Sequence, residues 1–76
     1  MKELSEELEK YGKVEKCGIF EGKFHVLITD GFSINANNTF SLAKKIIGVV
    51  GDEYPIVGKW VTNDNRFDLI LERRKK

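Results

Sequence analysis

The sequence predicts an α+β fold, a two-layer sandwich in which an antiparallel sheet of about five strands carries two helices on one face, in the order α-β-β-β-α-β-β. Two segments have apolar residues at helical spacing, and five short segments are rich in apolar strand formers. Turn residues separate most neighbouring strand segments, which favours hairpins and an antiparallel sheet. A chain of 76 residues with 41% apolar residues supports one domain, residues 1–76, and we expect residues 74–76 to be a disordered basic tail.

The first helix is predicted over residues 2–11. Leu4, Leu8 and Tyr11 lie at positions i, i+4 and i+7, so they form one apolar stripe along the helix. Gly12 follows the stripe and is expected to end the helix in the left-handed conformation.

Two strands are predicted next, at about 14–20 and 23–29, joined by the two-residue turn Glu21-Gly22. This turn sets a register in which Cys17 lies opposite Val26. Because side chains alternate along a strand, each face of the hairpin then has a defined composition. The core face holds Cys17, Ile19, Phe24, Val26 and Ile28, and the opposite face holds Lys16, Phe20, His25 and Leu27.

A third strand is expected at about 32–36, after the turn at Asp30-Gly31. Two registers fit this turn. A two-residue turn would direct the apolar residues of the third strand away from the core. A three-residue loop with Gly31 in the left-handed conformation would pair Val26 with Ile34 and add those residues to the core face. We favour the second register because a buried face determines register.

A second helix is predicted over about 40–50, where apolar residues line one side and Lys44 and Lys45 lie off it. The chain then forms a hairpin of strands 56–62 and 66–73 around the turn 63–65. One face of this hairpin pairs Ile56, Gly58, Trp60 and Thr62 with Phe67, Leu69 and Leu71. The other face carries Val57, Lys59 and Val61 with Asp68, Ile70 and Glu72.

Composition limits the function classes. The 13 basic residues nearly balance the 12 acidic residues, which excludes a strongly basic nucleic-acid arm as the whole protein. The balance hides a gradient, because residues 1–38 carry five Lys and seven acids while residues 39–76 carry eight basic residues and five acids. No signal-peptide pattern or membrane-spanning run occurs, so we expect a cytoplasmic protein with no membrane partner.

The chemistry-bearing residues are few. Cys17 and His25 are single residues of their kind, too few for a structural zinc site, and Cys17 is expected to pack as a small hydrophobe. His25 is interpreted as a half-exposed strand residue, and Asp68 as a solvated residue paired with Lys59. No nucleotide-binding glycine motif occurs. The sequence therefore predicts no catalytic residue, no metal site and no cofactor.

Large apolar residues on the sheet face away from the helices point to an interface, because an exposed apolar patch usually marks a contact surface. We expect a non-enzymatic binding or assembly module that acts through protein–protein contact with itself, as a homodimer, or with another protein. The predicted interface residues are Phe20, Leu27, Val57, Val61 and Ile70.

The alternative hypothesis is weak binding of RNA or other nucleic acid, because clustered basic side chains attract phosphates. The candidate contacts lie on the second helix, at the last hairpin and at the C-terminus. They are Lys44, Lys45, Arg66, Arg73, Arg74, Lys75 and Lys76.

Residues 3–47 resemble double-stranded-RNA-binding domains in their α-β-β-β-α plan, with residues 23–27 running into Asp30-Gly31 and basic residues in the second helix. The chain departs from that family at the tight turn Glu21-Gly22, where those domains have a long loop, and at Ser41-Leu42, where their basic cluster begins the helix. The plan is also similar to small HicA-like toxin ribonucleases, which implies a third hypothesis with His25 as the catalytic residue.

Overall fold

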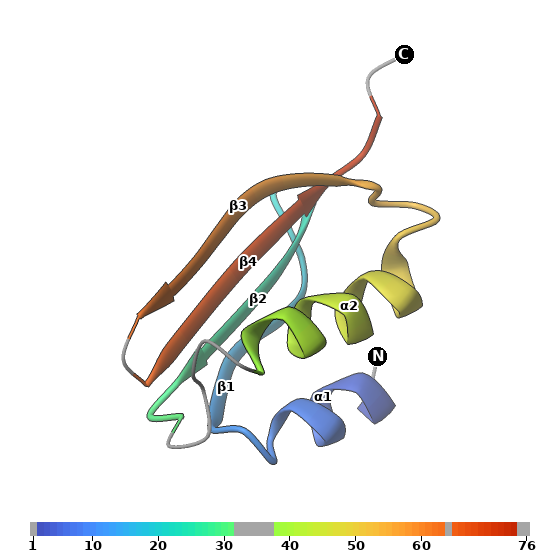
Figure 1. Cartoon of the computed structure of the whole chain (residues 1–76). Helices are drawn as coiled ribbons and strands as arrows, with labels where there is room; N and C mark the ends of the chain where they lie inside the picture. The colour runs from blue at the N-terminus through green and yellow to red at the C-terminus, as the bar shows by residue number, and fades with distance from the viewer. Residues whose placement is uncertain (1, 32–37, 64, 75–76) are drawn as a thin grey trace.

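The computed structural model describes residues 2–31, 38–63 and 65–74. It has an α+β fold with a four-stranded antiparallel sheet and two helices that cover the same face of the sheet (Figure 1). The class and the two-layer arrangement confirm the prediction, whereas the described sheet has four strands in place of about five. The elements are α1 (Lys2–Leu8), β1 (Lys13–Phe20), β2 (Lys23–Thr29), α2 (Thr39–Val50), β3 (Ile56–Asn63) and β4 (Arg66–Glu72).

The two hairpins of the chain join side by side to make the sheet, in the strand order β1-β2-β4-β3. The first hairpin turns at Glu21 and Gly22, whose φ angles of 54° and 77° are those of the tight two-residue turn that matches strand twist. Cys17 lies opposite Val26, as the turn predicts. In the second hairpin Trp60 lies opposite Leu69, which confirms the predicted register there.

The structure corrects the expected partner of β2. Val26 of β2 lies between Cys17 of β1 and Leu69 of β4, so Leu69 takes the place beside Val26 that was expected for Ile34. The expected third strand, 32–36, lies outside the described residues. At its start the chain turns with Asp30 at a φ of 53°, and Gly31 donates its N–H to the Asn65 carbonyl in the β3–β4 turn at 2.9 Å.

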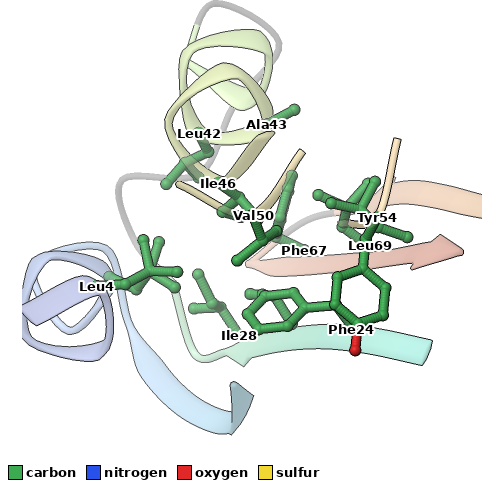
Figure 2. Packing of buried hydrophobic residues seen from close by; sticks show 13 residues of the cluster. Leu4, Phe24, Ile28, Leu42, Ala43, Ile46, Val50, Tyr54, Phe67 and Leu69 are labelled. Carbon is green, nitrogen blue, oxygen red and sulfur yellow. The ribbon is translucent and has the colours of Figure 1, made fainter. Parts of the chain in front are cut away.

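The core fills the space between the helices and the inner face of the sheet. Leu42, Ile46 and Val50 point from α2 toward sheet side chains that include Ile28 and Phe67 (Figure 2). Burial of this apolar surface is the main force that holds the two layers together. The buried apolar residues are Leu4, Leu8, Phe24, Val26, Ile28, Leu42, Ala43, Ile46, Val50, Tyr54, Phe67, Leu69 and Leu71.

Two predicted core residues of β1 are not buried. Ile19 is 60% exposed, and Cys17 is half-buried. β1 is an edge strand, and Ile19 lies near its last residue, Phe20. Helix α1 ends at Leu8 and is shorter than predicted. None of the described helices is long and apolar enough to cross a membrane.

Gly12 is required by close backbone packing and not by a left-handed φ, which corrects its predicted role. A Cβ at Gly12 would lie 2.7 Å from both the Gly31 Cα and the Thr29 carbonyl oxygen. A Cβ at Gly48, in the middle of α2, would have no neighbouring atom within 4 Å, so nothing in the surroundings of this residue demands glycine.

We expect opposite effects from alanine at these two glycines. Gly12→Ala should lower the free energy of unfolding by about 1–3 kcal/mol, because the backbone around it must move. Gly48→Ala should raise that free energy by about 1 kcal/mol, because alanine is the better helix former. Urea unfolding followed by circular dichroism measures both changes. Equal destabilisation by the two variants would contradict the packing described for Gly12.

Candidate functional site

The sheet has a face that carries no helix, which we call the open face (Figure 1). Its residues are those that alternate with the buried core residues along each strand. β2 and β4 form its centre, and β1 and β3 form its edges. The open face comprises Lys16, Gly18 and Phe20 of β1, Lys23, His25 and Leu27 of β2, Asp68, Ile70 and Glu72 of β4, and Ile56, Lys59 and Val61 of β3.

A polar cluster lies at the centre of this face. His25 and Asp68 are 43 positions apart in the sequence, yet His25 Nε2 lies 2.7 Å from Asp68 Oδ1. Lys59 of β3 approaches the other carboxylate oxygen of Asp68, with its Nζ at 3.2 Å. The side chains of His25 and Asp68 are only 16% and 7% exposed, while that of Lys59 is 50% exposed. The Lys59–Asp68 pair confirms one prediction. The expectation that Asp68 is solvated is wrong, because its side chain is buried, and the His25–Asp68 bond was not predicted.

Two opposing effects act on the pKa of Asp68. Burial raises it, and the hydrogen bonds from His25 and Lys59, together with their charges, lower it by more, so the pKa lies below its usual value. The carboxylate is therefore ionised at neutral pH, although the residues opposite it on the two neighbouring strands, Leu27 and Val61, are apolar. Ionised groups are costly to bury, and a buried carboxylate with a shifted pKa is typical of functional sites.

A hollow of about 360 Å³ lies beside this cluster, over β1 and β2. Lys16 Nζ stands 5.4 Å from the centre of the Phe20 ring, and the same ring meets the His25 imidazole edge-on at 6.3 Å. The hollow thus combines cationic nitrogens with an aromatic wall. Its lining residues are Lys16, Phe20, Glu21, Lys23, His25 and Ile70.

Four of the five predicted interface residues share the open face, and Val57 does not. A β-bulge between Val57 and Lys59 shifts the register, so Val57 lies opposite Leu71 of the core face and Ile56 lies opposite Glu72. A Cβ at Gly58, the extra residue of the bulge, would collide with the Glu72 carboxylate. Simple alternation cannot reveal a bulge, which inserts one residue into the pattern. The four residues on the open face are Phe20, Leu27, Val61 and Ile70.

The predicted nucleic-acid residues are dispersed. Arg66 and Arg73 lie at opposite ends of β4. Lys45 pairs with Glu7 of α1 at 3.2 Å, and Arg73 pairs with Glu53 at 3.4 Å, so both charges have acidic partners. The structure does not gather these residues on one surface. Lys44 and Arg74 are exposed, and Lys75 and Lys76 lie outside the described residues.

Sequence patterns missed an aromatic pair between α2 and β3. The rings of Phe40 and Trp60 stack with centres 6.2 Å apart, although Phe40 is 59% and Trp60 40% exposed. Trp60 Nε1 donates to Thr39 Oγ1 at 3.3 Å, and Thr39 shares a 2.6 Å hydrogen bond with Thr62. The side chains are therefore held in place at the surface. The pair joins two elements distant in sequence, so no local pattern could reveal it.

Other chemistry finds less support. In the described parts of the chain, no three His, Cys, Asp or Glu side chains lie close enough together to hold a metal ion. Burial raises the pKa of the Cys17 thiol, which disfavours the reactive thiolate. His25 has the orienting carboxylate that a general base needs, but no described hydroxyl or thiol bonds to it. Comparisons with protein families, curated proteins and solved structures find no match to this chain.

Asp68 should make the stability depend on pH in the acid range. Because its pKa is lowered on folding, its contribution is fully present above the ordinary aspartate pKa of about 3.9 and is lost as the pH falls through the lower folded value. We expect Asp68→Asn to be less stable at pH 7 and to lose less stability than the wild type between about pH 4 and pH 2. Urea midpoints across this range measure the effect, and Asp52→Asn is the control for an exposed carboxylate. Parallel pH curves for Asp68→Asn and wild type would contradict the role of the cluster.

Proposed function

We propose that this protein is an assembly module that pairs with a second copy of itself through the outer edge of β3, which has no strand beside it among the described residues. The observation that carries this proposal is the apolar character of that edge strand. Four large apolar side chains of β3 are exposed, on both faces of the sheet: Ile56 (44%), Val57 (47%), Trp60 (40%) and Val61 (39%). An exposed, apolar edge strand is a template for pairing with another strand.

The other edge of the sheet is better protected against such pairing. β1 carries the charged residues Lys13, Glu15 and Lys16, and a bulge at Glu15 interrupts its register. β3 has one charged residue, Lys59, and that charge is directed to Asp68 of its own sheet. Each edge strand has one bulge near its start, and residues 59–63 of β3 remain regular. Charged side chains are a usual protection of an edge, and β3 has one where β1 has three.

The charge pattern of β3 favours an identical partner. Two β3 strands can meet antiparallel about a two-fold axis, so that each chain presents the same surface to the other. Apart from Lys59, the strand has no charged side chain that such pairing would set against its own copy. A charged edge would favour a partner of different sequence and opposite charge, and β3 does not have such an edge.

The exposed apolar surface suits a small interface. Together with Phe40, β3 presents five exposed large apolar side chains, of which the aromatic ones can each bury about 150–250 Å². A standard interface buries about 800 Å² on each partner, so backbone pairing along β3 has to supply part of the contact. Trp60, held by Thr39, is suited to be the anchor, because tryptophan dominates binding energy where it is buried.

Val61→Lys tests the proposed edge. The wild type should sediment as a dimer at high concentration, and Val61→Lys should be monomeric, because the new lysine would repel its symmetry mate. Asp68 lies opposite position 61 and can pair with the new charge, so the fold should survive. The matched control is Ile19→Lys, which adds the same charge to an exposed apolar position on β1 and should leave the dimer intact.

Sedimentation equilibrium measures this result, and Trp60, the one tryptophan in the sequence, reports the same contact through its fluorescence. A wild type that remains monomeric at millimolar concentration would overturn the proposal. Loss of the dimer in Ile19→Lys but not in Val61→Lys would move the interface to β1 and also overturn it.

A further inference from the structure

The hollow beside His25 has the composition of a small-molecule site. Three of its six lining residues carry nitrogen donors, namely Lys16, Lys23 and His25, and Phe20 and Ile70 supply apolar surface. Pockets that bind small ligands combine an apolar wall with a few convergent polar groups in this way. The hollow lies over β1 and β2, away from the β3 edge proposed for assembly.

The cations of the hollow are available to a ligand. Lys16 stands over the Phe20 ring and has no carboxylate partner among the described residues. Among the described residues, Lys23 has only the Glu72 carboxylate at 3.9 Å, near the limit of an ion pair, and the Lys23 side chain is 50% exposed. An anion that contacts both ammonium groups would gain charge-assisted hydrogen bonds at little cost in broken pairs.

Asp68 fixes the orientation of His25 at the hollow. The bond from Nε2 to the Asp68 carboxylate orients the ring and leaves Nδ1 without a partner among the described residues. The charge of Asp68 is itself shared with Lys59, so the carboxylate does not act alone on the hollow. The imidazole therefore forms a fixed part of the wall of the hollow.

We propose that this hollow binds a phosphate ester that carries a flat ring, such as an aryl or nucleoside monophosphate. The phosphate oxygens accept hydrogen bonds from the ammonium groups of Lys16 and Lys23, and the ring packs against Phe20 beside the fixed His25 imidazole. Glu21, at the turn, is the one acidic group that lines the hollow and opposes an anion. The proposal is independent of self-assembly, because it uses no residue of β3.

Titration with phenyl phosphate tests the site, and the imidazole carbon–proton signals of His25 are an unambiguous NMR probe because the sequence has one histidine. We expect saturable shifts of these signals with a dissociation constant of order 1 mM. Inorganic phosphate should bind about fivefold more weakly, since it lacks the aromatic contact. Phenol, which lacks the anion, should not shift the signals.

Matched variants assign the groups. Lys16→Met and Lys23→Met should each weaken phenyl phosphate about tenfold, because each removes a charge-assisted bond. Glu21→Gln should strengthen binding. Lys44→Met is the control, since Lys44 also stands over a phenylalanine ring, Phe40 at 5.6 Å, but far from histidine in the fold; its affinity should equal that of the wild type.

Three results would overturn the proposal. The first is no saturable shift of the His25 signals up to about 50 mM phenyl phosphate, well above millimolar affinity. The second is equal weakening by Lys44→Met and Lys16→Met, which would show non-specific attraction. The third is weaker binding in Glu21→Gln, which would show that the hollow prefers a cation. Sedimentation of the same variants shows separately whether assembly is retained.

Discussion

The pairing of β2 with β4 is the interaction on which the rest of this structure depends. It joins the two hairpins and sets Val26 opposite Leu69 at the centre of the core face. Because side chains alternate along a strand, this register also decides what stands on the other face. Asp68 then lies one diagonal step from His25, so the register that completes the apolar core also assembles the polar cluster.

The same pairing defines which strands become edges. Among the described strands, β1 and β3 each have a neighbour on one side alone, and their compositions differ: β1 carries three charged residues, whereas β3 carries one and is apolar on both faces. A chain of this size has a thin core and gains stability when an apolar edge is covered. Self-association through β3 would extend the sheet and leave the open face, with the His25 hollow, accessible in both copies.

A buried ionised carboxylate is unusual in so small a domain. Apolar residues of similar volume at positions 25 and 68 would often serve stability as well or better, because desolvation offsets much of the attraction within an ion pair. The cluster therefore has a better explanation in binding than in folding. Its neighbours support this view, since the nearby hollow brings together two lysines and an aromatic ring that contribute little to the core.

Sequence patterns alone determined the α+β class, the two helices, both hairpins and their central registers, because helical spacing, strand alternation and turn residues act over a few positions. Local patterns also identified the Lys59–Asp68 pair. Local patterns could not determine that β2 pairs with β4, because several apolar strands could fill the same place beside β2. They also could not determine that a bulge at Gly58 moves Val57 off the open face. The His25–Asp68 bond follows from that long-range pairing. Only the tertiary structure decided these features, because they depend on which distant surfaces bury each other best.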